Sequence, residues 1–441
     1  MKKIVLLGAG KSATSLIDYL LQHAPKYKWQ VMVADQNLLL IRSKIGHSAH
    51  AVPIACDIQD GDARKKLIQD ADIVISLLPS SLQLTIVKEC INFKKNLLMA
   101  SYLSPEIRAL EKDIRKAGIL VLGEMGLDPG IDHMTSMQII DSIEKKGGII
   151  HSFKTYCGGL VAPESDNNPW HYKITWNPHN VVTAGSAGAV YKENNILHKI
   201  PYEELFARTG NIQVPGIGKM EYYPNRDGLY YEQLYGLQSA STFMRATLRY
   251  PDFCEGWNAL VQLGLTDDRK KQDTDSLSYL QWASQRLKHT PRKDAGPAFA
   301  AFLNVKEKSR VIRLLKYLDI FSTAPIRLGK CTNAEILESL LEKHFHLDYN
   351  DRDMVVMLHE VAFERRNIEA RLVSYLILAG EDSLHTAMAK TVGLPIAVFA
   401  RLFLTEQISL SGLHIPILPE IYRPVLKELD KLGLRFEEDF I

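Results

Sequence analysis

Short apolar runs alternate with segments of helical apolar spacing along the first part of the chain. The runs are rich in β-branched residues, which is typical of buried strands. They lie at Ile4–Leu7, Gln30–Ala34, Ala51–Ala55, Ile73–Leu77, Leu97–Ala100 and Ile119–Leu122, with helical patterns at Ser12–His23, Asn37–Ile45, Gly61–Asp70, Leu82–Asn92 and Pro105–Ala117. Strands that alternate with helices predict an α/β fold with a doubly wound parallel sheet.

The pattern changes after residue 149, where strand-like segments occur without regular helices between them. They predict a second α+β domain with a largely antiparallel sheet, and they lie at His151–Cys157, Tyr172–Trp176, Met220–Tyr223, Thr247–Tyr250 and Met354–Phe363. Helical spacing over 251–345 predicts an insertion. We therefore expect a first domain over 1–130, a second over 131–250 and 346–385, and an apolar helix, Thr386–Leu404 within 386–441, that packs back on the first domain.

A glycine turn separates the first strand from the first helix, in the pattern Gly8-x-Gly10-x-x-Ala13. Gly8 permits a tight turn, and Gly10 lets backbone N–H groups approach a pyrophosphate. Ala13 is small enough for the helix to pack on the strand. An acidic residue, Asp35, closes the second strand at the distance that a ribose contact needs. The stretch predicts a Rossmann dinucleotide-binding domain; the alternative is a glycine-containing turn in another α/β domain.

In doubly wound sheets ligands bind over the carboxyl ends of the strands. Asp57, after the third strand, contacts the adenine or caps the next helix, and the sequence leaves both open. The expected cofactor-binding residues are Gly8, Gly10, Lys11, Ser12, Ala13, Asp35, Asp57, Ile58, Leu77, Leu78, Pro79, Gly126, Leu127 and Trp176.

Two aspartates lie in a glycine-rich segment, 123–134, that cannot simply continue a strand or helix. Asp132 is placed to be the N-cap of a helix over Thr135–Lys145. Asp128 has no such position and lies next to the expected nicotinamide, so we expect it to act on the substrate. His133 could transfer protons, although a histidine in the first turn of a helix is more often structural.

Composition adds few constraints. With 53 Lys and Arg against 51 Asp and Glu, the net charge is +2, which gives no reason to expect a nucleic-acid or membrane partner. Five cysteines without metal-type pairing predict free thiols, no metal site and a cytoplasmic location. We find no signal peptide and no apolar stretch long enough to span a bilayer.

Several segments together resemble one enzyme family. These are Gly126–His133, Tyr156–Glu164 with Asn168 and Tyr172, Tyr223–Asp227, Arg245–Tyr250 and Asp351–Val356, and they are similar to saccharopine dehydrogenase of the L-glutamate-forming kind, or saccharopine reductase. The resemblance implies an NADP-binding Rossmann domain, a substrate and dimerisation domain with a helical insertion, and a homodimer. It also implies the interconversion of saccharopine with L-glutamate and 2-aminoadipate 6-semialdehyde, in lysine metabolism.

That chemistry reduces an imine with hydride, so the site must hold carboxylates and move a proton. We expect catalysis from Asp128, assisted by Tyr102; Cys157 is either a reactive thiol or a small buried residue. The expected substrate-binding residues are Ser101, Tyr102, Asp128, Cys157, Gly158, Arg226, Arg245 and Thr247. For each arginine the alternative is a surface or interdomain ion pair, and Arg249 could compete with Arg245 for the inward position.

The cofactor prediction departs from the resemblance. A carboxylate at Asp35 can accept hydrogen bonds from ribose hydroxyls but repels a 2′-phosphate, and the nearest cations are Arg42 and Lys11. We therefore expect NAD(H) rather than the family's NADP(H), although Asp35 could instead cap the next helix. Two alternative functions remain open: a related imine-reducing enzyme, such as carboxynorspermidine or homospermidine synthase, and a non-enzymatic nucleotide-binding sensor.

Overall fold

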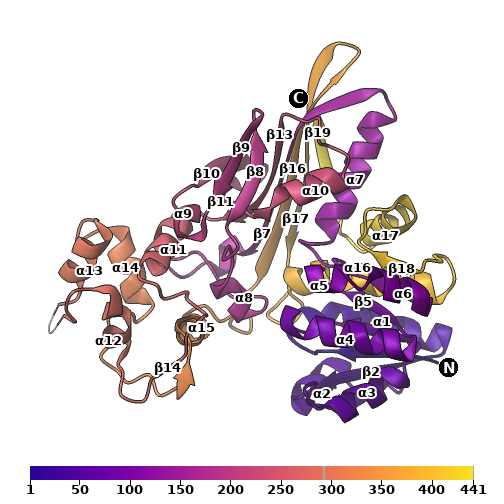
Figure 1. Cartoon of the computed structure of the whole chain (residues 1–441), viewed down its shortest axis with the longest axis horizontal. Helices are drawn as coiled ribbons and strands as arrows, with labels where there is room; N and C mark the ends of the chain where they lie inside the picture. The colour runs from indigo at the N-terminus through magenta and orange to yellow at the C-terminus, as the bar shows by residue number, and fades with distance from the viewer. Residues whose placement is uncertain (292–293, 441) are drawn as a thin grey trace. The chain divides into compact units, whose positions relative to one another are not determined.

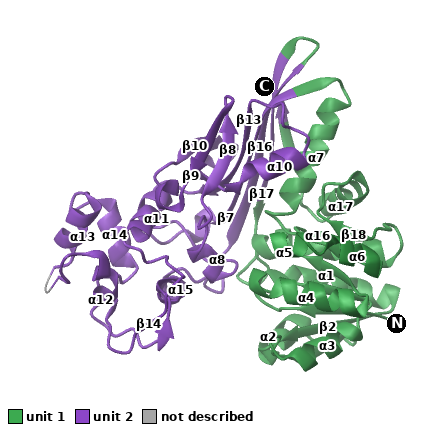
Figure 2. Ribbon diagram, viewed as in Figure 1, with its two compact units in different colours: residues 1–149, 365–368, 378–438 green, residues 150–364, 369–377, 439–441 purple. Residues whose placement is uncertain are grey.

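A computed structural model describes residues 1–291 and 294–440, and these divide into two compact units (Figures 1 and 2). Unit 1 contains residues 1–149, 365–368 and 378–438. Unit 2 contains residues 150–364 and 369–377 and the chain from 439 on. The boundary that we expected at residue 130 falls within unit 1, just before helix α7 (Ile131–Glu144).

Unit 1 is built on a parallel sheet in the order β18-β6-β5-β4-β1-β2-β3. The predicted α/β fold is confirmed, with strands β1 (Lys2–Leu7), β2 (Trp29–Asp35), β3 (Ala51–Ala55), β4 (Ile73–Ser76), β5 (Asn96–Met99), β6 (Leu120–Leu122) and β18 (Gly412–His414). The seventh strand, β18, pairs with β6 from the far end of the chain. This strand was not predicted, because three residues are too few to show a strand pattern.

The helices of unit 1 connect these strands. They are α1 (Thr14–Tyr27), α2 (Leu38–Ile45), α3 (Gly61–Gln69), α4 (Ser80–Phe93), α5 (Pro105–Arg108), α6 (Glu111–Ala117), α7, α16 (Ala387–Leu404) and α17 (Pro419–Lys431). The single helix expected over Pro105–Ala117 is in fact two, α5 and α6, separated at Ala109 and Leu110.

Helix α16 packs on α1, as expected for the apolar segment near the C-terminus. A β-carbon on Gly393 would lie 3.0 Å from the Leu16 backbone nitrogen, so glycine permits this close approach. The contact is extended by Arg401, whose Nε donates to the Tyr19 hydroxyl at 2.7 Å. Contrary to the sequence analysis, α16 is long and apolar enough to cross a membrane by length and composition alone. However, 83% of it is buried inside the protein, which is typical of a core helix.

The main sheet of unit 2 has ten strands in the described part of the chain. They are β7 (Gly148–Val161), β8 (Ala189–Glu193), β9 (Ile196–Ile200), β10 (Gly210–Val214), β11 (Gly218–Pro224), β12 (Arg226–Asp227), β13 (Thr242–Arg249), β16 (Asp353–Arg365), β17 (Ile368–Ala379) and β19 (Glu437–Phe440). The sheet is mixed: β10, β11 and β13 are antiparallel neighbours, whereas β7 and β13 run parallel.

The strand expected at Tyr172–Trp176 is absent, because this buried segment is irregular. Its polar backbone groups are satisfied individually instead of by a ladder. The amide of Ile174 donates to the carbonyl of Phe345 at 2.7 Å, and the Asn168 side chain donates to the carbonyl of Tyr172 at 2.9 Å.

The predicted helical insertion is present in unit 2 (Figure 1). Its main helices are α11 (Phe253–Gln262), α12 (Tyr279–Ala283), α13 (Gly296–Leu303), α14 (Arg310–Tyr317) and α15 (Asn333–His344), and a short pair, β14 (Gln272–Asp273) and β15 (Lys330–Cys331), joins them. Shorter helices before the insertion are α8 (Pro178–Val182), α9 (Tyr202–Leu205) and α10 (Gly228–Leu234). The apolar core includes Trp170, Trp257 and Trp282.

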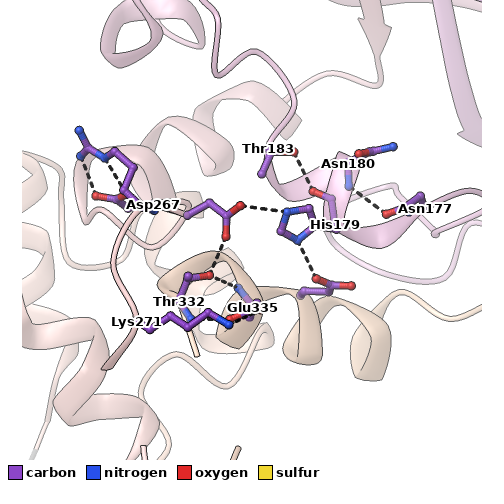
Figure 3. A network of polar contacts seen from close by, with 11 residues as sticks. Asn177, His179, Asn180, Thr183, Asp267, Lys271, Thr332 and Glu335 are labelled. Atoms are coloured by element: carbon purple, nitrogen blue, oxygen red, sulfur yellow. Dashed lines mark hydrogen bonds and ion pairs between the residues drawn. The ribbon is translucent and has the colours of Figure 1, made fainter. Parts of the chain in front are cut away.

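A polar network connects α8 with α15 (Figure 3). The His179 ring lies between two carboxylates, with Nδ1 3.0 Å from Glu338 and Nε2 3.1 Å from Asp268. Asp268 also accepts the Thr332 hydroxyl at 2.7 Å. Burial alone would lower the pKa of His179, but the hydrogen bond to Glu338 and the charge of Asp268 raise it overall.

Because the pKa of His179 is raised in the folded protein, this network stabilises the fold fully below the unfolded value of about 6.5, and the contribution is lost as pH rises through the folded pKa. We expect His179→Gln to lower the melting temperature more at about pH 6 than at about pH 9. His289→Gln, at an exposed histidine of the same unit, is the matched control. Equal losses at both pH values would contradict this account.

Candidate active site

The glycine turn lies between β1 and α1. Gly8 has a φ of +97°, and a β-carbon there would lie 3.3 Å from the Leu77 carbonyl, so both the conformation and the close approach favour glycine. At Gly10 no atom lies within 4 Å of the position of a β-carbon. A 3-10 turn, η1 (Lys11–Ala13), precedes α1, so the helix begins later than Ser12. The exposed turn fits the backbone approach of an anion such as pyrophosphate.

Asp35 joins the end of β2 to the glycine turn. Its Oδ2 accepts the Ala9 amide at 2.8 Å, and its Oδ1 accepts the Asn37 amide at 2.9 Å. The N-cap of α2 is Asn37, whose side chain accepts the Leu40 amide at 3.0 Å. The alternative in which Asp35 caps this helix is therefore wrong, and the half-buried carboxylate instead links the end of β2 to the glycine turn.

Asp57 follows β3 and faces the residue after Asp35. Its Oδ1 accepts the Gln59 amide and the Gln36 side chain, each at 2.9 Å, and these two hydrogen bonds lower the pKa of Asp57. The helix-cap alternative for Asp57 is wrong, because Asp60 caps α3. The carbonyl of the next residue, Ile58, accepts a hydrogen bond from Arg64 at 2.5 Å.

Leu77, Leu78 and Pro79 follow β4, which pairs with β1. The Gln83 side chain fixes this segment by donating to the Leu78 carbonyl at 2.9 Å. Because Leu77 also contacts Gly8, the segment borders the glycine turn as expected for cofactor-lining residues.

A compact turn after β6 carries Asp128. The amide of Gly126 donates to the Pro129 carbonyl at 2.8 Å, and Gly130 packs so closely that a β-carbon would lie 2.0 Å from the Gly126 oxygen. Tyr102 follows β5, and its hydroxyl donates to Asp128 Oδ1 at 2.8 Å. Two of the expected catalytic residues therefore meet at the carboxyl edge of the sheet.

Neighbouring groups in unit 1 extend this part of the candidate site. The Ser101 carbonyl accepts the amide of Glu124 at 3.1 Å. The buried Ser101 hydroxyl has no hydrogen-bond partner within residues 1–291 and 294–440, which suits a side chain that meets a ligand. The Leu127 carbonyl accepts the amide of Asp132 at 3.1 Å, so Leu127 is held in the same turn.

A buried ionic cluster supports the turn. Glu124 pairs with Arg108 at 2.8 Å and with Nε2 of His133 at 3.0 Å, and both Glu124 and His133 are fully buried. The Asp132 carboxylate accepts the amide of Gly130 at 2.6 Å. The expected N-cap role of Asp132 is wrong: α7 begins at Ile131, and Asp132 lies in its first turn. These contacts favour the structural interpretation of His133.

In unit 2, one face of β7 and β13 carries the expected polar residues. Met244, Ala246 and Leu248 of β13 pack in an apolar cluster, and the residues between them lie on the opposite face. Thr247 lies on this opposite face and pairs in register with the buried Cys157 on the parallel strand β7. A β-carbon on the following residue, Gly158, would lie 2.9 Å from Leu248.

Two arginines on this face of β13 are buried. The guanidinium of Arg245, 1% exposed, lies 4.3 Å from the centre of the Tyr231 ring. Arg249 points inward too, 5.1 Å from the centre of the Phe253 ring. Arg226, by contrast, is exposed at the start of β12, although the amide of the preceding Asn225 donates to the Arg245 carbonyl at 2.8 Å. Burial excludes a surface ion pair for Arg245.

Trp176 was expected to bind the cofactor. It belongs to unit 2, where its Nε1 donates to the Tyr172 hydroxyl at 3.3 Å. The candidate residues therefore form two groups: the cofactor residues with Ser101, Tyr102 and Asp128 in unit 1, and Trp176, Cys157, Gly158, Arg226, Arg245 and Thr247 in unit 2.

Lys44 was not among the residues predicted from the sequence. This residue is buried in α2, and its Nζ donates to the Gly10 carbonyl at 2.5 Å. Helical periodicity contained a signal, because Lys44 follows the apolar Ile41 by three positions and so lies on the same buried face.

Both units are similar to domains of known proteins. Residues 4–122 match the family model of the saccharopine dehydrogenase NADP binding domain, and residues 126–434 match that of the saccharopine dehydrogenase C-terminal domain. The NADP(+), L-glutamate-forming saccharopine dehydrogenase of Saccharomyces cerevisiae is 34% identical over 99% of each chain. The resemblance inferred from the sequence motifs is thereby confirmed.

Solved structures agree. The apo, histidine-tagged L-glutamate-forming saccharopine dehydrogenase from Saccharomyces cerevisiae superposes with a TM-score of 0.86 at 32% identity and covers 100% of both chains. A homospermidine synthase from Legionella pneumophila in complex with NAD gives a TM-score of 0.59 at 10% identity, over 100% of this chain and 91% of that one. The second likeness is one of fold alone.

Gly130→Ala tests the close packing of the turn that carries Asp128. Gly130→Ala would place a β-carbon 2.0 Å from the Gly126 oxygen at a φ of +146°, so we expect it to destabilise the protein by more than about 3 kcal/mol. Gly147→Ala has a φ of +76°, which an L residue can adopt at modest cost, and no atom lies within 4 Å of the position of its β-carbon, so it should cost only about 1 kcal/mol. Urea unfolding measures both variants. Equal losses would contradict the packing role of Gly130.

Proposed function

The chain belongs to the saccharopine dehydrogenase family, and from this premise we propose that it interconverts saccharopine with L-glutamate and 2-aminoadipate 6-semialdehyde, in lysine metabolism. The observation that carries the proposal is the likeness to the yeast enzyme, which extends over 99% of both chains. Neither unit lacks a counterpart in that relative. The activity is an oxidoreduction at a carbon–nitrogen bond that uses a nicotinamide cofactor.

The turn at Gly8–Ala13 would hold the cofactor pyrophosphate, and Asp35 would accept the ribose hydroxyls. When bound, the nicotinamide supplies or takes the hydride. Asp128, hydrogen-bonded to the Tyr102 hydroxyl, is suited to hold the substrate amine and to exchange its proton. In unit 2 the guanidiniums of Arg226 and Arg245 would bind substrate carboxylates, since a planar guanidinium can hold a carboxylate through two parallel hydrogen bonds.

Backbone groups at Cys157 and Gly158 and the hydroxyls of Ser101 and Thr247 would complete the binding of the substrate. The buried hydroxyl of Ser101 supports such a contact. For Cys157, burial level with Thr247 supports a small positioning residue over a reactive thiol, because buried free cysteines ordinarily behave as small apolar residues.

An assay separates the proposal from its alternatives. Purified protein is mixed with saccharopine and either oxidised cofactor, and absorbance is followed at the reduced-nicotinamide band. We expect the oxidised cofactor to be reduced when saccharopine is present. If only another amine–aldehyde pair oxidises reduced cofactor, the protein is a related imine-reducing enzyme, such as the homospermidine synthase whose fold it shares. Cofactor binding without turnover of any pair would indicate a sensor.

Asp128→Asn tests the proton-transfer role. The amide keeps the shape of the side chain but cannot accept a proton, so we expect kcat to fall by about 100-fold or more while the Kd for the reduced cofactor changes little. Asp113→Asn, at an exposed carboxylate of α6, is the matched control and should keep normal turnover. Near-normal kcat in the Asp128 variant would remove it from the catalytic mechanism.

We further propose that NAD(H) is preferred over NADP(H), against the NADP in the names of the family model and the yeast relative. The support is the position of the Asp35 carboxylate at the turn. Two like charges about 4 Å apart repel by roughly 4 kcal/mol at an effective dielectric of about 20, which disfavours a 2′-phosphate there. Gln36, the next residue, is neutral.

Measuring kcat/KM with both cofactors tests this preference. We expect an advantage for NADH, and Asp35→Ser should narrow it because the repulsion of the 2′-phosphate is removed. An advantage of about tenfold or more for NADPH in the unaltered protein would refute the argument from Asp35.

Location and assembly are also proposals. The five cysteines are free and buried, which supports a reducing, cytoplasmic compartment. A homodimer is the commonest closed assembly, and we propose it here. Light scattering in solution measures the mass, and a value matching one chain of 49.8 kDa would exclude the dimer.

A further inference from the structure

The buried Lys44 has no place in the reaction described above. Its side chain is 8% exposed and lies in the last turn of α2. Its Nζ donates to the Gly10 carbonyl at 2.5 Å, and the same carbonyl accepts the amide of Ala13 at 3.0 Å. A charged side chain on α2 therefore holds the peptide before the 3-10 turn η1, which leads into α1.

The direction of that peptide matters for an anion. In a trans peptide the C=O and the following N–H point in opposite directions. The bond between Gly10 and Lys11 is trans, so the hydrogen bond from Lys44 to the carbonyl directs the N–H of Lys11 to the opposite side of the peptide. Gly10 is exposed, with open space around its α-carbon. Outward N–H groups at the start of a helix are the donors that bind phosphate oxygens.

The charges around Lys44 come from two neighbouring elements. Burial lowers the pKa of Lys44 to about 8, and the carboxylates of Asp35, at the end of β2, and Asp18, on α1, oppose that shift. Asp18 is in turn 3.6 Å from Nε2 of His385, which precedes α16. The Lys44 ammonium thus interacts electrostatically with a carboxylate at the end of β2 and with another on α1.

We propose that Lys44 is a cofactor-positioning residue, whose ammonium orients the Gly10 peptide toward the pyrophosphate. The inference rests on the proposed dinucleotide-dependent function and concerns binding rather than hydride transfer. An anionic ligand favours the charged form of Lys44. Affinity should therefore be highest below pH 8 and fall as pH rises through the pKa of Lys44, about 8.

Lys44→Met tests this by removing the charge while retaining a side chain of similar length. NADH is titrated into the full-length protein by fluorescence, one pH unit below and one above the pKa of about 8. We expect the variant to bind about tenfold more weakly at the lower pH and to lose the pH dependence that the unaltered protein shows. Its melting temperature should not fall, because an apolar side chain avoids the desolvation of a buried ammonium.

Two further variants separate the role of Lys44 from a general effect of charge. Lys66→Met removes the same charge from an exposed site on α3 and should leave NADH affinity unchanged. Asp18→Asn removes a carboxylate that stabilises the ammonium, so the pH at which affinity falls should move to a lower value.

Three results would overturn the inference. One is an unaltered affinity and pH profile in Lys44→Met, which would leave the proposed function intact. Another is an equal loss of affinity at both pH values together with a lower melting temperature, which would show a purely structural role. The third is the absence of NADH and NADPH binding by the unaltered protein, which would reject the proposed function as well.

Discussion

The hydrogen bond from the Ala9 amide to the Asp35 carboxylate is the constraint on which the cofactor side of the protein depends. It fixes the end of β2 against the turn after β1, where Gly8 already approaches the Leu77 carbonyl. The carboxyl ends of the neighbouring strands β1, β2 and β4 therefore lie close together. The same carboxylate that organises the turn also contributes negative charge where we propose that the cofactor ribose binds.

Most of unit 1 could be predicted because its strands are continuous apolar runs and its helices are amphipathic. What the sequence could not give were features set by distant residues. β18 pairs with β6 across most of the chain, and its three residues carry no pattern of their own. The segment at Tyr172–Trp176 has the composition of a strand, but its amides and carbonyls bond to side chains and loops. Tertiary contacts override local propensity in such segments.

The candidate site likewise contains residues that the sequence predicts and residues whose roles depend on tertiary structure. The glycine turn, Asp35 and the Tyr102–Asp128 pair follow from their positions after predicted strands. The capping roles considered for Asp57 and Asp132 were wrong, because a cap depends on where the helix begins to within one residue. Lys44 was missed because a lysine near the end of a short helix is ordinarily solvated. Only the three-dimensional position of Gly10 reveals its partner.

The close contact of Gly393 with α1 has a consequence for how the protein is made. Unit 1 begins at the N-terminus, but α16 and β18 are synthesised only after residues 150–364 of unit 2. Until then the emerging chain lacks an edge strand and a covering helix, so the apolar surface of α1 and the outer edge of β6 stay exposed on the ribosome. That span carries most of unit 2, and the last strand of its sheet, β19, is made later still. Each unit therefore needs elements from near the C-terminus before its sheet is complete.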